Sequence, residues 1–403
     1  MPDPGRQAVT GFMNVKSVKE IVAFCQEIFD DTNFTKAREW KAARPGRKVI
    51  GYMPVYVPRE ILHAAGMLPL GILGGGADME VIHGDAYYQS YICRIPRSTI
   101  ELAISGKLDF VDGMLFPSIC DVIRNLSGIW QLLFKDKYVR YFDAPQNFKD
   151  EVGGVFYSKE LREFKEGLEK LAAREIADEE INRSIAVFNE NRRWVNKVYD
   201  FRSDFPWKAP SAEVYLLMRA GMVLPPEDHT RLMQAYLAAA EAEERPMRDN
   251  CRVLLTGVFC EQPPLSLIKS LEISGCYIVD DDFLLVSRWL LGDVPTDGDP
   301  IESLSQAFLR HSAQTAAKYE SDMEVKGSYL LDAIRRRNAD GVIFAAPSFC
   351  DPALLDQPMI ISRLDALKIP YITMQYAENS GQMQPIREQS GTFADSIKLW
   401  SAS

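Results

Sequence analysis

The sequence predicts an α/β protein made of two duplicated, Rossmann-like α/β lobes, each with a mainly parallel sheet, joined by a helical segment. Three observations support this fold class. Short apolar runs alternate with helical patterns toward both ends of the chain, which is typical of β-α-β units. A long middle region carries helical patterns without strand signals. One string, Asp-Gly followed by an apolar strand and Pro-Ser-x-Cys-Asp, occurs in each half, at 112–121 and 340–351.

With 403 residues, the chain has room for two or three domains and can bury large cores. Its composition, 47% hydrophobic and 25% charged, is that of an ordinary globular protein. The net charge is −10, from 46 Lys and Arg against 56 Asp and Glu, and the acidic residues are spread along the chain, which argues against a nucleic-acid surface. No apolar run approaches the ~18–20 residues that span a bilayer, and residues 1–19 lack a signal-peptide core. We therefore expect a cytoplasmic protein with neither a membrane nor a nucleic-acid partner.

Residues 1–46 are expected to form N-terminal helices, and residues 47–156 the first α/β lobe. Apolar side chains at helical spacing predict two helices within 18–44, closed by the breaker Arg44-Pro45-Gly46. The first lobe then alternates, with strands at Val49–Val55, Leu68–Leu73, Met114–Phe116 and Val139–Phe142, and helices at Pro58–Ala65, Ser98–Leu108 and Asp121–Phe134. Ser98 is placed to cap the second of these helices.

Residues 157–248 are predicted to form a helical connector, and residues 249–403 the second α/β lobe. The connector has long patterns rich in Glu, Lys, Arg and Ala, at Lys159–Ala173, Asp178–Tyr199, Ala212–Gly221 and Pro226–Glu244. In the second lobe we expect strands at Val253–Val258, Cys276–Val279, Val342–Ala346 and Tyr371–Met374, with helices at 265–274, 302–312, 325–337, 352–366 and 384–400. The order of elements repeats that of the first lobe, which supports an internal duplication.

Cys120 and Cys350 take the same place in the two copies of the repeated string, where a strand ends and a helix begins. Ligands of parallel sheets sit beyond the carboxyl ends of the strands, where helix N-termini point. Backbone N–H groups and the helix dipole favour a thiolate there, so we expect lowered thiol pKa values. If the lobes face each other across a pseudo-twofold axis, the two cysteines converge on one cleft.

The other five cysteines divide by context. Two thiolates are too few for a stable metal cluster, so Cys93, just before a helix, and Cys260, at a strand end, become further candidates. Cys25, Cys251 and Cys276 lie on apolar faces or at strand starts and are interpreted as structural. The spacing contains no Cys-x-x-Cys pair and no zinc or ferredoxin signature, so it does not by itself identify a metal. A Cys-His nucleophile stays open, although duplicated cysteines suit ligation better than nucleophilic catalysis, which needs only one.

The glycine-rich run Gly71–Gly76 lacks the Lys-Ser/Thr of a phosphate-binding loop and the order of a dinucleotide fingerprint. We interpret it as a tight turn or a close backbone approach. The chain thus shows no nucleotide motif of its own.

Several segments together resemble the benzoyl-CoA reductase and 2-hydroxyacyl-CoA dehydratase family, and within it the gamma, or C, subunits of ATP-dependent reductases. The segments cover nearly the whole chain and are KVIGYMPVYVPREILHAAGMLPLGILG from Lys48, YICRIPRS from Tyr91, PSICDVIR from Pro117, FCEQPPL from Phe259, PSFCDP from Pro347 and YAENSGQMQPIREQSGTFADSIKLW from Tyr376. The resemblance implies that Cys93, Cys120 and Cys350 hold a [4Fe–4S] cluster, with Cys260 as the candidate for its fourth position.

The resemblance also implies the activity and the partners. It implies two-electron reduction of benzoyl-CoA to cyclohexa-1,5-diene-1-carbonyl-CoA by a heteromer with a homologous beta subunit. ATP would be hydrolysed by separate alpha and delta activator subunits that take electrons from ferredoxin, and not bound by this chain. The sequence does not identify the proton donor to the ring. Arg94 and Arg97 either contact CoA phosphates or are ion-paired at a helix start, and Tyr56 and Tyr91 are interpreted as packing residues.

Two alternatives remain. The chain could be part of a 2-hydroxyacyl-CoA dehydratase, in which one recycled electron drives loss of water. From a different class, it could be a non-catalytic scaffold paired with a catalytic homologue. Electron stoichiometry separates the first alternative from the reductase, and iron content separates the second.

Overall fold

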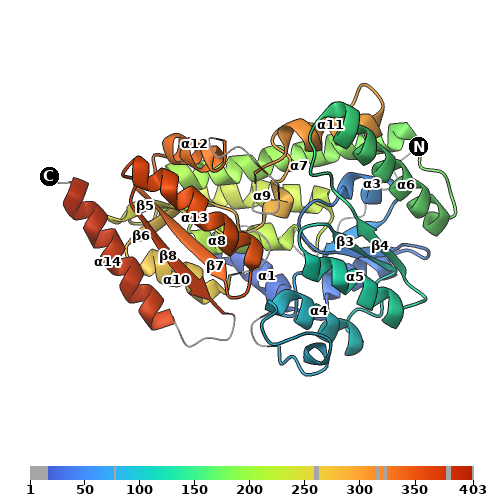
Figure 1. Ribbon diagram of the computed structural model, residues 1–403, viewed down its shortest axis with the longest axis horizontal. Coiled ribbons are helices and arrows are strands. Elements are labelled where there is room, and N and C mark those ends of the chain that lie inside the picture. The colour runs from blue at the N-terminus through green and yellow to red at the C-terminus, as the bar shows by residue number, and fades with distance from the viewer. Residues whose placement is uncertain are drawn as a thin grey trace.

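The computed structural model describes residues 17–76, 79–257, 263–314, 318, 320, 325–377 and 383–401. Two α/β lobes lie side by side, with the second lobe and the C-terminal helix on one side and the first lobe on the other (Figure 1). Each lobe contains a four-stranded, all-parallel sheet. The predicted fold class, two Rossmann-like lobes joined by helices, is therefore confirmed.

The two sheets have the same strand order, which supports the duplication. The first lobe has the order β2-β1-β3-β4 and the second β6-β5-β7-β8, so in both the second strand lies at one edge and the fourth at the other. The strands are β1 Val49–Tyr52, β2 Leu68–Gly71, β3 Gly113–Pro117, β4 Tyr138–Phe142, β5 Cys251–Thr256, β6 Cys276–Asp281, β7 Gly341–Pro347 and β8 Tyr371–Tyr376. The two central strands of each sheet are buried along their whole length, with one exception at Arg252, because helices cover both faces.

Helices make up most of the remaining chain. They are α1 Val18–Asp30, α2 Thr35–Ala42, α3 Arg59–Ala64, α4 Arg94–Ile104, α5 Asp121–Leu133, α6 Val155–Ala172, α7 Asp178–Asp204, α8 Ser211–Ala220, α9 Pro226–Ala242, α10 Leu265–Ile273, α11 Pro300–His311, α12 Ser328–Arg337, α13 Asp351–Ala366 and α14 Met383–Ser401. None of the helices in the described ranges is long and apolar enough to cross a membrane.

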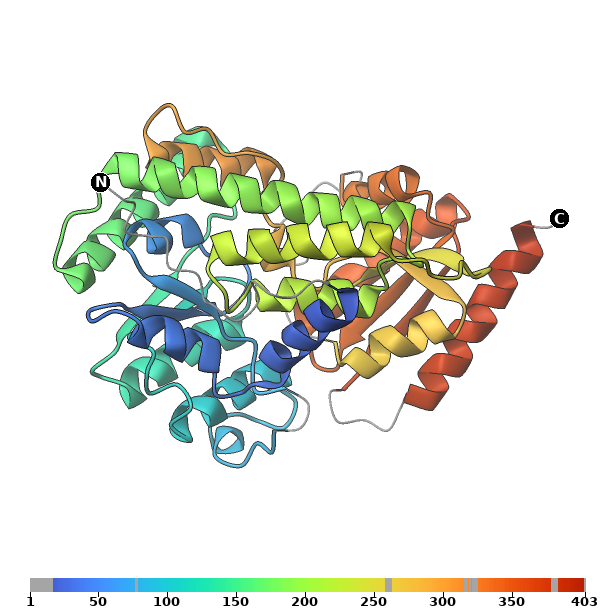
Figure 2. The same cartoon turned by 180° about the vertical axis from the view of Figure 1, so that it is seen from behind.

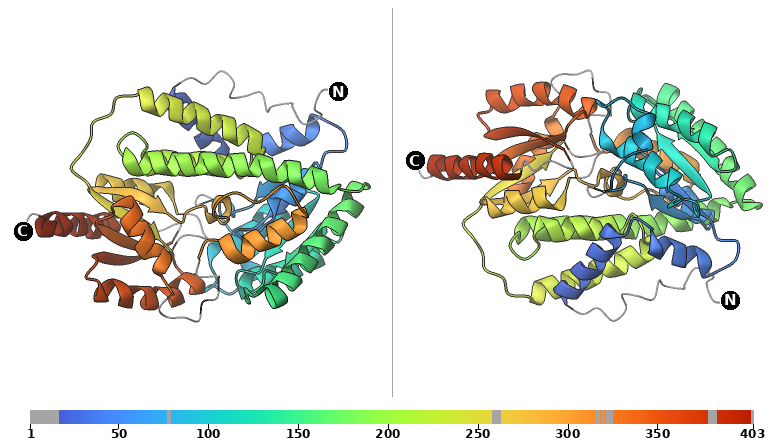
Figure 3. Two further views of the ribbon diagram at one scale, coloured as in Figure 1. Left: turned by 90° about the horizontal axis from the view of Figure 1, so that it is seen from above. Right: turned by 90° about the horizontal axis from the view of Figure 1, so that it is seen from below.

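A layer of helices runs along the back of both lobes (Figures 2 and 3). The long helix α7 contacts α9, α3 and β6, and α8 contacts α10, so the layer touches both sheets or their covering helices. The N-terminal helix α1 packs on α8 and α9. One continuous apolar core extends through the first lobe, this layer and one face of the second sheet, with a smaller cluster on that sheet's other face. The helical segment therefore packs as a shared wall behind both lobes.

Some predicted boundaries shift by a few residues. The first strand ends at Tyr52, before Pro54. Helix α4 begins at Arg94 with Cys93 as its N-cap, so the prediction that Ser98 caps this helix is wrong. The Ser98 hydroxyl lies inside the helix and donates to the carbonyl oxygen of Arg94 at 3.0 Å.

Candidate functional site

The two Pro-Ser-x-Cys-Asp loops make the same backbone contact with the neighbouring strand. The amide of Ser118 donates to the carbonyl oxygen of Phe142 at 2.9 Å, and that of Ser348 donates to Tyr376 at 2.7 Å. Phe142 and Tyr376 are the last residues of β4 and β8. The loops differ at Phe349, which has a φ of 68°. A bulky side chain rarely adopts this left-handed conformation, so its neighbours must hold the turn that leads to the cysteine.

The aspartates that begin the repeated string are equivalent as well. Asp112 accepts a hydrogen bond from the amide of Val49 at 2.8 Å, at the start of β1. Asp340 accepts one from the amide of Arg252 at 2.7 Å, near the start of β5. Each aspartate therefore ties the start of the third strand to the first strand of its sheet. Because the cysteine follows the end of this third strand, the contact helps to determine where the cysteine lies.

Cys93, Cys120 and Cys350 are the N-cap residues of α4, α5 and α13. Cys350 is 4% exposed, and Cys93 and Cys120 are half-buried. Each thiol thus stands at the positive end of a helix dipole, where unpaired N–H groups gather. The sequence predicted this placement for Cys120 and Cys350.

Electrostatic interactions connect Cys120 with Cys350, and Tyr88 with Cys93 and Cys120. Burial raises the pKa of Cys120, and the charge of Cys350 adds to the increase. Burial also raises the pKa of Tyr88, with further contributions from Cys93 and Cys120. Cys120 therefore lies near Cys350 of the other lobe, and Tyr88 lies near Cys93 and Cys120.

The expectation of a lowered thiol pKa is wrong for Cys120, whose pKa is raised. The backbone N–H groups of Val122 and Ile123 do lower its pKa, as predicted, but the loss of solvent around the sulfur has the larger effect. A positive metal centre would shift the balance back toward the thiolate.

The chemistry of this region fits an iron–sulfur cluster. Within the part of the chain that the structure describes, no three His, Cys, Asp or Glu side chains are grouped to hold one metal ion. In a [4Fe–4S] cluster each thiolate binds a different iron, so the three sulfurs need not meet at one atom. The hydroxyl of Tyr88 is buried and has no hydrogen-bond partner among the described residues. The Tyr88 hydroxyl could therefore donate a hydrogen bond to a sulfur-rich anion that is bound beside the thiols.

Tyr88 was not identified from the sequence. It lies in a loop that no repeat or known motif marks, although the neighbouring pair Tyr87-Tyr88, five residues before Cys93, was a usable signal. Its position depends on how this loop folds over α4, which local sequence does not specify.

The other candidate residues have ordinary roles or lie outside the described ranges. Cys25, Cys251 and Cys276 are buried, as expected of structural residues. Cys260 lies outside the described residues. Arg97 pairs with Asp85 at 2.9 Å, which supports the ion-pair interpretation.

The contacts of Arg94, of the glycine-rich run and of the two tyrosines bear on three further expectations. Arg94 donates to the backbone carbonyl oxygens of Gly76 and Met79. The glycine-rich run is a close backbone approach, since a Cβ on Gly74, whose φ is +79°, would lie 2.5 Å from the Ser98 hydroxyl. Tyr56 packs edge-on against Trp289 and Phe308, whereas Tyr91 is exposed.

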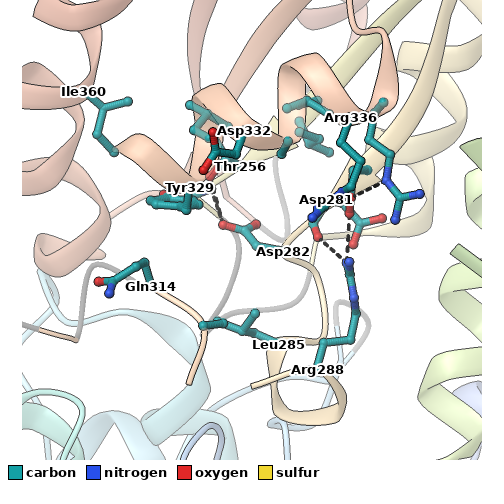
Figure 4. A pocket seen from close by; sticks show the side chains of 18 of the residues that line it. Thr256, Asp281, Asp282, Leu285, Arg288, Gln314, Tyr329, Asp332, Arg336 and Ile360 are labelled. Carbon is teal, nitrogen blue, oxygen red and sulfur yellow. Dashed lines mark hydrogen bonds and ion pairs between the residues drawn. The ribbon is translucent and has the colours of Figure 1, made fainter. Parts of the chain in front are cut away.

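A cavity of about 510 Å³ opens at the second sheet, alongside the last residues of β5 and β6 (Figure 4). Its lining includes Thr256 and Gly257 at the end of β5, Asp282 after β6, Ala346 of β7 and Ala353 of α13. Ala346 and Ala353 lie on either side of the Pro-Ser-Phe-Cys-Asp loop in the chain, so the cavity lies next to Cys350. No pattern in the sequence predicted it.

A buried ion network forms one wall of this cavity. Asp281 accepts from Arg202 at 2.5 Å and from the Tyr199 hydroxyl at 2.9 Å, which ties β6 to α7. Asp280 accepts from Arg288 and Arg337, both at 2.9 Å. The run Asp280–Asp282 at the end of β6 and the run Arg335–Arg337 were a usable sequence signal, because like charges at the end of a buried strand require partners.

Comparison with known proteins gives consistent similarities. The family model described as "2-hydroxyglutaryl-CoA dehydratase, D-component" matches residues 54–397. The chain is 65% identical over 385 residues to the C subunit of benzoyl-CoA reductase from Thauera aromatica, covering 96% of this chain and 100% of that protein. It is 27% identical to the (R)-phenyllactyl-CoA dehydratase beta subunit of Clostridium sporogenes, over 87% of this chain and 92% of that one. It is also 27% identical to the beta subunit of (R)-2-hydroxyglutaryl-CoA dehydratase of Acidaminococcus fermentans, over 87% of this chain and 93% of that one.

Proposed function

The chain belongs to the 2-hydroxyglutaryl-CoA dehydratase D-component family, and from this premise we propose that it is a catalytic-module subunit of an ATP-dependent benzoyl-CoA reductase. In this proposal it carries an iron–sulfur cluster for low-potential reduction of the aromatic ring. The observation that supports it most is the 65% identity to a reductase subunit over the full length of that protein.

The reaction explains why such a cluster is needed. Benzoyl-CoA takes up two electrons and two protons to give cyclohexa-1,5-diene-1-carbonyl-CoA. Adding the first electron costs aromatic resonance energy, so a very low-potential donor is required. A [4Fe–4S] cluster supplies single electrons at low potential when it is held by thiolates and screened from water. The thioester carbonyl group helps because its oxygen accepts charge as the electron arrives.

The residues of this chain would serve the reaction by ligation and by shielding. We propose Cys93, Cys120 and Cys350 as three ligands, with Cys260 as a candidate for the fourth position. The helix N-termini that these residues cap stabilise negative charge on the thiolates. The burial of Cys350, at 4% exposure, limits access of water to its side of the site.

The proposal includes partners. ATP hydrolysis and electron delivery from ferredoxin are assigned to separate activator subunits, and the catalytic module also contains a homologous beta subunit. One relative is named as the C subunit of its enzyme and others as beta subunits, which supports a heteromer. A reaction that consumes ATP and reduced ferredoxin places the chain in the cytoplasm. The isolated chain is therefore expected neither to bind ATP nor to reduce benzoyl-CoA.

The test is anaerobic co-expression with the homologous partner, followed by iron and sulfide analysis and low-temperature EPR of the reduced complex. With the activator subunits and ATP added, the complex should form the diene and consume two electrons per product. A monomer that turned over benzoyl-CoA with ATP on its own would contradict the assignment of roles.

A role in a dehydratase is the second candidate, supported by the 27% identities to two dehydratase beta subunits. The same ligands would then pass one electron to a 2-hydroxyacyl thioester, which loses water and returns the electron. A dehydratase needs only a priming electron, whereas the reductase consumes reductant in every turnover, so electron counting separates the two. A scaffold without a cluster would contain no iron after anaerobic purification.

A further inference from the structure

Glu101 of α4 binds the loop that precedes this helix, residues 79–93. Its Oε2 atom accepts from the amides of three consecutive residues, Ile82 at 2.9 Å, His83 at 2.6 Å and Gly84 at 2.9 Å. Its Oε1 atom accepts from Nδ1 of the His83 ring at 3.0 Å. A single carboxylate therefore holds four donor groups of the loop.

The contact suits a charged acceptor. Glu101 is 6% exposed, and a buried carboxylate is stable only when hydrogen bonds replace its lost water. Burial raises the pKa of Glu101, but the bonds from the His83 side chain and the three amides outweigh this effect, so the pKa is lowered. Consecutive backbone N–H groups that point to one spot form an anion-binding concavity. Here the anion is a side chain of the same protein.

Two further features hold the loop against α4. A Cβ on Gly84 would lie 2.0 Å from the carbonyl oxygen of Arg97, so this close approach requires glycine. Arg97 also pairs with Asp85 at 2.9 Å, and Arg94 donates to a backbone carbonyl oxygen at the start of the loop. Arg94, Arg97 and Glu101 follow one another at helical spacing, so one face of α4 makes all of these contacts.

The same loop carries Tyr88. This residue comes two positions after the 3-10 helix η1 Gly84–Ala86, whose first amide is bound by Glu101. The Tyr88 hydroxyl is buried and has no hydrogen-bond partner among the described residues. Burial raises its pKa, and Cys93 and Cys120 raise it further, so the ring lies near both thiols. The position of the hydroxyl thus depends on a segment that Glu101 fixes.

We propose that Glu101 is a positioning residue for the iron–sulfur cluster, because it holds the loop in which the Tyr88 hydroxyl faces the thiols of Cys93 and Cys120. The inference rests on the proposed function, since the cluster is part of that proposal. Glu101 lies eight residues beyond Cys93 along α4, or about 12 Å at ~1.5 Å per residue. It therefore acts through the loop and not by contact with the cluster.

Amide hydrogen exchange of the anaerobic heteromer, read by peptide mass spectrometry, tests the first step. Glu101→Ala leaves three amides without their acceptor, so exchange at residues 82–84 should become at least about tenfold faster. Glu101→Gln keeps one oxygen that can accept from these amides, and its exchange should lie between that of Glu101→Ala and the wild type. Asp85→Ala is the matched control on the same loop, because it removes only a half-exposed ion pair. Unchanged exchange in Glu101→Ala would overturn the proposal.

An EPR-monitored redox titration of the same heteromers tests the second step. A hydrogen bond from Tyr88 would stabilise the more negative, reduced cluster, so Glu101→Ala should lower the midpoint, by no more than Tyr88→Phe does. Glu101→Gln should restore part of the difference, and iron content should stay that of the wild type. In a Tyr88→Phe background, Glu101→Ala should cause no further shift, because the hydroxyl that it positions is gone. Equal shifts in both backgrounds would overturn the proposal.

The outcomes separate this inference from the proposed function. Faster exchange with an unchanged midpoint would overturn the inference and leave the reductase function standing. The expected midpoint shifts without reduction of benzoyl-CoA would support the inference and contradict the reductase function. A wild-type heteromer without iron would contradict both.

Discussion

Cys120 of the first lobe and Cys350 of the second interact electrostatically, although each caps a helix of a different sheet. Burial is the main reason that the pKa of Cys120 is raised, and the charge of Cys350 raises it further. Two like charges next to each other in a buried place are unfavourable unless a cation lies between them. The two sulfurs are therefore close enough to influence each other, as the proposed shared cluster requires.

The first prediction concerns iron content. Cys93→Ala, Cys120→Ala and Cys350→Ala should each lose most of the iron, because an iron left without its thiolate is open to water and oxygen. Anaerobic iron counts on the purified complex check this. The controls Cys25→Ala, Cys251→Ala and Cys276→Ala should keep iron, since these residues lie in the packed core. Full occupancy after removal of Cys120 or Cys350 would contradict the ligand set.

The second prediction is that Tyr88→Phe shifts the cluster potential and leaves iron content unchanged. A hydrogen bond from the Tyr88 hydroxyl would stabilise the more negative, reduced state, so its loss should lower the midpoint by about 40 mV, taking ~1 kcal/mol for one hydrogen bond. An EPR-monitored redox titration measures the shift. Tyr87→Phe, at a 40% exposed neighbour, is the control. Identical midpoints in the two variants would assign Tyr88 to packing alone.

The third prediction concerns the ion pair of Arg202 and Asp281, both 0% exposed. Arg202→Met should destabilise the fold by about 3–5 kcal/mol, because it leaves Asp281 charged and buried. Urea unfolding of the double variant Arg202→Met/Asp281→Leu should show a smaller loss. Arg193→Ala breaks a pair that is about half exposed on both sides and should cost less than ~1 kcal/mol. If the double variant were the least stable, charge burial would not be the reason for the loss.

The fourth prediction is an acid sensitivity caused by His229. Burial lowers its pKa from 6.5 to about 3, so the folded protein keeps the ring neutral where the unfolded chain is protonated. The contacts agree with this, since Asn191 donates to Nδ1 at 3.2 Å and Nε2 donates to the carbonyl oxygen of Leu217 at 3.1 Å. Stability should fall as the pH drops from 6.5 toward 3, by roughly 2 kcal/mol between pH 7 and 5.

Urea unfolding at several pH values measures this slope. His229→Gln should be less stable at pH 7, because it loses the fitted ring, and should show a flatter dependence on pH. His311→Gln, at an exposed position, should keep the slope of the wild type. An unchanged slope in His229→Gln would assign the acid sensitivity to other groups.

The sequence by itself determined the α/β class, the duplication and the strand-end position of two cysteines. These features are local, since alternating apolar runs and a Cys that follows a strand are written in consecutive residues. The glycines of the repeated Asp-Gly pairs are also visible in the sequence, although the reason for them is a contact with a distant segment. A Cβ on Gly113 would lie 2.7 Å from the Tyr138 carbonyl oxygen, and one on Gly341 would lie 2.9 Å from that of Pro370, so close strand approach requires glycine in both lobes.

Only the tertiary structure decided which distant residues meet. Tyr88 reaches Cys93 and Cys120 because its loop folds back beside α4, and Arg202 reaches Asp281 because α7 crosses behind the second sheet. The thiol pKa of Cys120 also depended on burial, which outweighs the helix N-terminus that the sequence predicted. Desolvation and ion pairing arise between segments far apart in the chain, so packing of the two lobes on the shared helical layer determines them.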